Sequence, residues 1–193
     1  MMAAAMPQVA FAQATGITAY ATGQGTPNQI VLNGIYVKAQ VVSHCGFATA
    51  PSGTYNQPDF DVAGLAHDFG FVLDCTGPSR VAVTSANGGL LNTAAGLQPS
   101  GYIAKAPYNV ELFLDGTTGD ANATCAAATL ASGGSCGFVG TASETVGLAL
   151  NAPATTANSS YLRVSAPAYN YAALPVLVDG TYQDTLTVTV SAQ

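Results

Sequence analysis

Hydrophobic and polar residues alternate in short runs along much of this chain. The last run is the clearest, because Leu186, Val188 and Val190 alternate with threonine and serine. Successive side chains of a β-strand point to opposite faces, so one face of this segment is apolar and the other is rich in hydroxyl groups. The pattern predicts a half-buried terminal strand in which Leu186, Val188 and Val190 face the core.

Similar runs predict further strands, and turn residues separate them. Gly, Pro, Asn and Asp stand between the runs, as at residues 87–89 and 179–180. No long run has the period and the caps of a helix. Short strands divided by such turns are typical of an all-β sandwich or barrel. The predicted strands are 35–44, 69–75, 80–85, 108–114, 145–150, 161–165, 176–178 and 182–190, with a long loop or hairpin over 116–140.

Composition narrows the class of protein. The 193 residues are enough for one domain with a full core, and only 7% of them are charged, against roughly 25% in ordinary domains. The net charge is −6 with four Lys and Arg, too few cations to neutralise nucleic-acid phosphates. No stretch reaches the roughly 18 continuous apolar residues of a membrane span. These features fit a secreted, assembling β-protein and exclude nucleic acid as a partner.

The N-terminus has the features of an export signal. Residues 1–14 are apolar and small, and they end in Ala12-Gln13-Ala14, which matches an Ala-x-Ala signal-peptidase site. No basic residue precedes this site, so we interpret 1–14 as the remnant of a signal peptide that is removed after Ala14. The alternative is that these residues belong to the mature chain.

Four cysteines indicate an oxidising compartment and allow three disulfide pairings. Cys125 and Cys136 flank a loop of small residues, as a local bridge would. There is no Cys-x-x-Cys motif, and His44 and His67 are the only histidines. Because zinc sites need clustered Cys and His ligands, we expect disulfides and no metal.

The segment Gly180-Thr-Tyr-Gln-Asp-Thr185, with the alternation that follows it, resembles the C-terminal strand of the spore coat protein U domain. Bacteria use this domain for subunits of archaic chaperone–usher pili. Other resembling pieces are the run that ends in Cys45, the run 69–75 with 80–85 and Gly88-Gly89, and the run 108–115. Together they cover most of residues 36–190. The Cys125–Cys136 loop looks like an insertion, and the segment before Ile35 is longer than is usual in the family.

The resemblance implies an incomplete immunoglobulin-like β-sandwich over residues 35–193, completed by a donor strand from a neighbouring subunit. It implies a Cys45–Cys75 bridge between the ends of the first two strands. The implied partners are identical subunits, a periplasmic pilus chaperone and an outer-membrane usher. The implied product is an adhesive fibre on the bacterial cell surface that supports attachment and biofilm formation, and no cofactor is expected.

Two pieces of residues 15–34 could be the donor strand. Ile17, Ala19 and Ala21 alternate with polar or aromatic residues in one piece, and Ile30 and Leu32 form the other. A fully buried Ile or Leu contributes roughly 1.5–3 kcal/mol, so we favour a donor that includes Ile30 and Leu32. The alternatives are an exported N-terminus without fixed structure and a strand that pairs within its own chain.

Candidate active sites are weak. Gly133-Gly-Ser-Cys-Gly137 matches Gly-x-Ser-x-Gly, but the nucleophile elbow needs a strand, a helix and a later histidine, and no histidine follows His67. Asp115, Asp120 and Asn122 could bind calcium but lack the EF-hand spacing. We therefore expect a protein that is not an enzyme. The alternative to a fibre subunit is a self-contained secreted β-sandwich that binds a carbohydrate or surface ligand through its loops.

Overall fold

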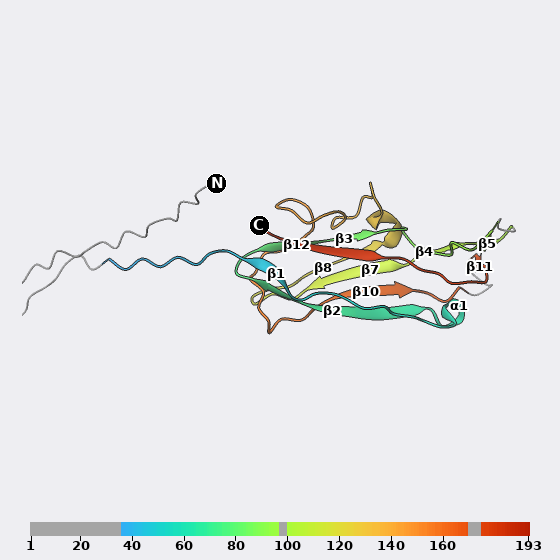
Figure 1. The fold of residues 1–193 in the computed structure, drawn as a ribbon, viewed down its shortest axis with the longest axis horizontal. Coiled ribbons are helices and arrows are strands. Elements are labelled where there is room, and N and C mark those ends of the chain that lie inside the picture. Colours follow the sequence, from blue (N-terminus) through green and yellow to red (C-terminus); the bar gives the residue numbers. More distant parts are fainter. Residues whose placement is uncertain (1–35, 97–99, 170–174) are drawn as a thin grey trace, which may run out of the picture. The chain divides into compact units, whose positions relative to one another are not determined.

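The computed structural model describes residues 36–96, 100–169 and 175–193. The chain divides into two units, residues 1–41 and 42–193. Of the first unit only residues 36–41 are described, and they contain no strand or helix. The second unit is all-β, with several sheets and two very short helices (Figure 1).

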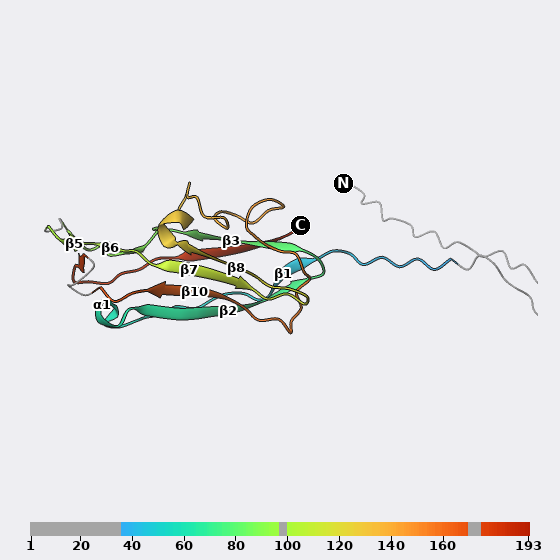
Figure 2. The same cartoon turned by 180° about the vertical axis from the view of Figure 1, so that it is seen from behind.

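The larger sheet of the second unit is antiparallel. In order across the sheet, from one edge to the other, its strands are β1 (Cys45–Thr49), β2 (Leu65–Cys75), β10 (Ser160–Ala166), β7 (Asn109–Leu114) and β8 (Ala121–Ala126). The smaller sheet is also antiparallel, with strands β12 (Leu186–Ala192), β3 (Ser79–Ser85) and β9 (Leu148–Leu150). These two sheets form the two layers of a sandwich (Figure 1 and Figure 2).

One hydrophobic core lies between the two layers. Alternate residues of β7 are buried, as in Val110, Leu112 and Leu114, and β3 contributes Val81 and Val83, although Ala82 between them is buried as well. The strand period of two therefore aligns one face of each sheet toward the core.

Short elements lie outside the two main sheets. They are β4 (Leu90–Leu91), β5 (Tyr102–Ile103), β6 (Lys105–Ala106), β11 (Val176–Leu177), the helix α1 (Phe60–Ala63) and the 3₁₀ turn η1 (Ala127–Leu130). β4 pairs with β6, and β5 pairs in parallel with β11. These elements have two to four residues each, and hydrophobic periodicity cannot predict elements that short.

The predicted strand over 35–44 is wrong over its described residues, 36–44, because the strand begins only at Cys45. The register explains this. Cys45 lies opposite Cys75, which is the last residue of β2. Among the described residues 36–44, only His44 has a backbone hydrogen-bonding partner beyond the end of β2. Its backbone N–H donates to the Thr76 hydroxyl, and its carbonyl accepts from the Thr76 N–H. The other seven predicted strands each overlap an observed strand, and the 116–140 stretch contains β8, paired with β7 as a hairpin.

Both disulfides join the expected cysteine pairs, Cys45–Cys75 as the resemblance implies and Cys125–Cys136 as the flanked loop indicates. Cys45 is bonded to Cys75 across β1 and β2, and Cys125 is bonded to Cys136. No helix in the described part of the chain is long and apolar enough to span a bilayer. Two disulfides are compatible with a secreted or extracellular protein.

Candidate functional site

The edges of the two main sheets are open on one side of the sandwich. β1 ends the larger sheet and β12 ends the smaller one. Every residue of β12 is in register with β3, from Leu186 opposite Ser85 to Ala192 opposite Ser79. On its other edge, β12 forms no ladder with any described segment. An open edge of this kind presents unpaired N–H and C=O groups and can pair with another strand.

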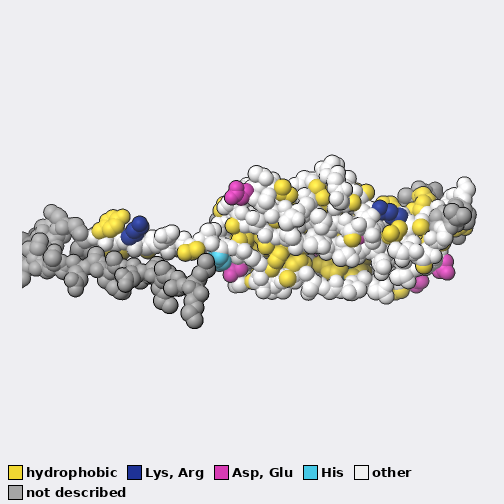
Figure 3. Space-filling view, turned by 45° about the horizontal axis from the view of Figure 1, so that its top comes forward, with side chains coloured by type: hydrophobic (Ala, Val, Ile, Leu, Met, Phe, Trp, Pro, Cys, Tyr) yellow, Lys and Arg dark blue, Asp and Glu magenta, His cyan; other side chains and the backbone are white. Residues whose placement is uncertain are grey.

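An apolar groove lies beside this open edge and encloses about 550 Å³. Hydrophobic side chains from four strands form its walls, and a strip of hydrophobic side chains is visible along one face of the β-unit in Figure 3. These residues are Phe47 of β1, Leu65 and Phe69 of β2, Leu162 and Val164 of β10, and Leu186 and Val188 of β12. The groove is therefore a place where the core is left incompletely filled.

The terminal strand has the orientation that its alternation predicts. Leu186, Val188 and Val190 are partly buried and pack against the core, while Thr187 is exposed. Val188 lies opposite the fully buried Val83. On the other face, the Thr189 hydroxyl accepts a hydrogen bond from the Ala142 backbone N–H, so a loop covers that side of β12.

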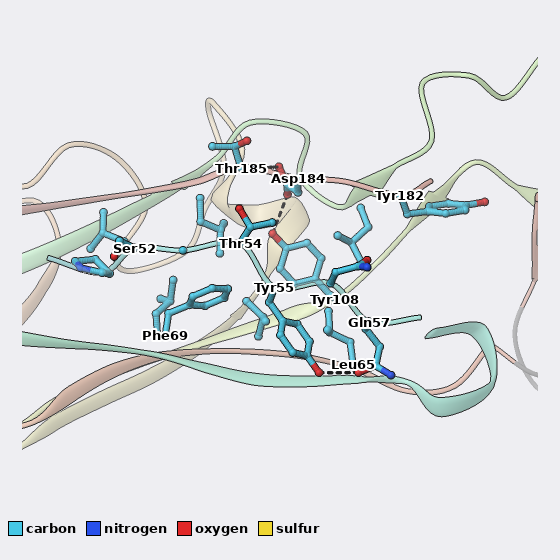
Figure 4. Close-up of a pocket in the computed structure, with 18 of the residues that line it drawn as sticks. Ser52, Thr54, Tyr55, Gln57, Leu65, Phe69, Tyr108, Tyr182, Asp184 and Thr185 are labelled. Carbon is cyan, nitrogen blue, oxygen red and sulfur yellow. Dashed lines mark hydrogen bonds between the residues drawn. The ribbon is translucent and has the colours of Figure 1, made fainter. Parts of the chain in front are cut away.

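The polar end of the groove is organised by Asp184. Its carboxylate accepts a hydrogen bond from the Ser85 hydroxyl at 2.5 Å. It accepts another from the Tyr108 hydroxyl at 2.8 Å (Figure 4). It also accepts bonds from the backbone N–H groups of Asn87 at 3.0 Å and Gly89 at 3.3 Å. One carboxylate thus joins the segment before β12 to β3, to the turn after β3 and to the start of β7.

Tyr108 is buried beside this carboxylate. Burial raises the pKa of its phenol well above the usual value, and the hydrogen bond to Asp184 raises that pKa further. The hydroxyl is therefore protonated and remains a donor to Asp184 across the neutral range.

The other two residues of the Gly-x-Tyr-x-Asp motif also have structural roles. Gly180 has a φ of 139°, and a Cβ there would lie 2.4 Å from the side-chain nitrogen of Asn92. The Tyr182 hydroxyl lies 2.9 Å from the Val178 carbonyl oxygen and 3.0 Å from that of Ile103. The motif was recognised in the sequence, but the role of Asp184 as a hydrogen-bonding centre was missed, because its partners come from distant segments.

The predicted donor residues Ile17, Ala19, Ala21, Ile30 and Leu32 lie outside the described residues. The residues nearest to them that are described, 36–42, form no ladder with any described strand. Tyr36 is 85% exposed, Val37 84%, Val41 81% and Val42 77%. Sequence reasoning assigned these residues to the first strand and so missed an apolar segment that is available for pairing.

The weaker candidate sites have ordinary structural contacts. Asp115 accepts hydrogen bonds from the Ser159 N–H and the Asn158 amide, and Asp120 accepts one from the Gly116 N–H. Within the described ranges, no group of three His, Cys, Asp or Glu side chains could hold a metal ion.

His67 and Asp68 point to opposite faces of β2. Asp68 forms a bidentate pair with Arg163 at 2.6 and 2.7 Å, and this pairing lowers the pKa of the Asp68 carboxyl. His67 instead stacks on Tyr55.

No protein-family model matches this chain, and a search of the curated proteins finds no match either. The resemblance to the spore coat protein U domain therefore rests on the motifs described above.

Proposed function

We propose that this chain is a structural subunit of an extracellular adhesive fibre, polymerised by donor-strand complementation in the chaperone–usher manner. The observation that carries the proposal is the unpaired edge of β12 beside an apolar groove. A sandwich with this opening is an incomplete immunoglobulin-like fold, which a strand from an identical subunit completes. A periplasmic chaperone and an outer-membrane usher are the proposed assembly partners, and surface attachment with biofilm formation is the proposed role.

We place the donor strand at residues 36–42 instead of within 15–34. Val37, Ala39 and Val41 share one face of an extended segment, and Tyr36, Lys38, Gln40 and Val42 share the other. The segment is as long as the seven-residue strand β12. Full burial of a valine contributes roughly 1.5–3 kcal/mol, and each hydrogen bond in the ladder contributes about 1 kcal/mol.

The short connection between residues 36–42 and β1 favours donation to another chain. To enter its own groove beside β1, the segment would have to turn back through Ser43 and His44. Two-residue hairpins favour Gly, Asn or Asp, which supply the positive φ angles of such turns, and neither position has one. The backbone of His44 is hydrogen-bonded to Thr76, so the chain at His44 continues in the direction of β1 and does not turn back there.

The test compares two substitutions in the donor segment of the full chain. Val41→Asp would bury an unpaired carboxylate in the neighbour's groove and should abolish polymerisation. Gln40→Asp, one position away on the opposite face, should polymerise like the wild-type chain. Polymer is measured as ladders on gels run without boiling and as fibres in electron micrographs.

Equal polymerisation of the two variants would contradict residues 36–42 as the donor. A wild-type chain that stays monomeric at high concentration would contradict the fibre subunit as a whole. The second result would favour the self-contained sandwich that binds a carbohydrate or surface ligand.

A further inference from the structure

Residues 50–57, which we call the strap, connect β1 to the segment before α1 and all line the groove. We propose that the strap is a gate that covers the groove of the free subunit and is displaced when a donor strand enters. This inference rests on the proposed function and adds a regulatory step to the same site.

The strap is not part of either sheet. The β1 ladder shifts register between Phe47 and Thr49 and then ends, so residues 65–71 of β2 have no partner on that side among the described segments. Within the described chain, no backbone group of residues 50–57 is hydrogen-bonded to a strand. The hydrogen bonds from strap side chains are local, from the Tyr55 hydroxyl to Gln57 and from the Gln57 amide to the Pro58 carbonyl.

One aromatic contact holds the strap in place. The Tyr55 ring stacks on His67 of β2, with centroids 3.9 Å apart and planes at 6°. His67 in turn meets Phe69 edge-on at 4.7 Å. Figure 4 shows Tyr55 turned toward β2 from the strap that runs past Asp184 and Tyr108.

The strap matches the groove poorly. Ser52, Thr54 and Asn56 are polar and exposed, although the groove walls are mainly hydrophobic. Pro51 has no N–H to donate, and Gly53 has a φ of 114°, so the segment is not a regular strand. A donor with alternating apolar residues would gain hydrogen bonds to the free edge of β12 and would fill the groove. Displacement of the strap mainly breaks the ring stack between Tyr55 and His67.

The experiment measures how fast a fluorescent peptide with the sequence of residues 35–43 binds to the full chain. The chain carries Val41→Asp so that its own donor does not compete. Tyr55→Ala should accelerate binding about two- to tenfold, the range expected from loss of one aromatic pair. His67→Ala should have the same effect, and the double variant should be no faster than either single one, because both remove one contact.

Tyr161→Ala is the matched control. Tyr161 stacks on Phe113 at 5.0 Å, but on the outer face of the larger sheet. This variant should bind the peptide at the unchanged rate. Circular dichroism confirms that each variant is folded.

The outcomes separate the two proposals. Peptide binding at the same rate in all variants, or slower binding after Tyr55→Ala, would overturn the gate and leave the donor strand intact. No binding to any variant, including the parent chain, would overturn the gate and residues 36–42 as the donor, while the fibre subunit itself is tested by the polymerisation of the wild-type chain.

Discussion

Asp184 and Tyr108 place a charge and a phenol together at one end of an apolar groove. An ionised carboxylate is costly there unless donors surround it, and five groups supply hydrogen bonds, the fifth being the Thr185 backbone N–H. Hydrogen bonds to a charged group contribute roughly 1.5–3 kcal/mol, about twice a neutral one. The pair therefore stabilises the turn after β3 and the start of β12, which borders the groove.

Tyr108 should make the protein sensitive to alkaline pH. The phenol pKa is raised in the folded chain, whereas in the unfolded chain it is about 10. Its stabilising contribution is therefore complete below pH 10 and decreases as the pH rises from 10 toward the folded pKa. Between pH 10 and 11 this group alone should lower the free energy of unfolding by about 1 kcal/mol.

Urea unfolding of Tyr108→Phe at pH 8, 10 and 11 checks this expectation. The variant should be less stable at pH 8, because Asp184 loses one donor, but its stability should fall less steeply with pH. Tyr36→Phe, at a position that is 85% exposed, is the control and should follow the wild type. An equally steep fall in Tyr108→Phe would contradict the assignment.

At the scale of the elements, alternation predicted the strands that have a buried face and a partner. β12 is an example, since Leu186, Val188 and Val190 have the orientation their spacing predicts. Alternation does not reveal whether a partner exists, and the 35–44 prediction failed for that reason. Residues 36–44 alternate well, but β2 ends opposite Cys45.

The groove could be predicted only through the resemblance, and its details could not. Its walls combine Phe47, Phe69, Leu162 and Val188, from strands that are distant in the sequence. The strap has no periodic pattern, and its anchor joins Tyr55 to His67 through a tertiary contact. Such contacts depend on how strands are ordered in the sheets, which local propensity does not specify.

The two disulfides should differ in their effect on stability. They close loops with separations of 30 residues for Cys45–Cys75 and 11 for Cys125–Cys136. Chain entropy gives about 3.6 kcal/mol for the longer loop and about 2.8 kcal/mol for the shorter one. The Cys45–Cys75 disulfide also holds β1, which borders the groove. Loss of this disulfide should therefore weaken binding of the donor peptide.

The comparison uses two double variants, Cys45→Ser with Cys75→Ser and Cys125→Ser with Cys136→Ser. Urea unfolding should show the larger loss for the first variant, and only this variant should bind the donor peptide more weakly than wild type. A larger loss of stability in the second variant would contradict this ranking.

At the scale of the whole molecule, the proposed function depends on the free edge of β12 and a separate apolar segment, residues 36–42. β12 ends at Ala192, and the Gln193 N–H donates to the Pro78 carbonyl, so the C-terminus lies at the end of that edge strand. A donor copy attached behind Gln193 through a flexible linker would begin beside the strand it must pair with. Because an intramolecular strand avoids the entropy cost of association, it should be more stable than one from a second chain.

We therefore expect a chain that lacks residues 1–42 and carries a copy of residues 35–43 behind Gln193 to be monomeric. Burial of the copies of Val37 and Val41 should raise the melting temperature by roughly 10 °C over the same truncation without the copy. The control carries aspartate at the copies of Val37 and Val41 and should show no increase. Light scattering measures the oligomeric state, and calorimetry measures the melting temperature. An unchanged melting temperature with the intact copy would mean that residues 35–43 do not fill the groove, whatever the wild-type chain does at high concentration.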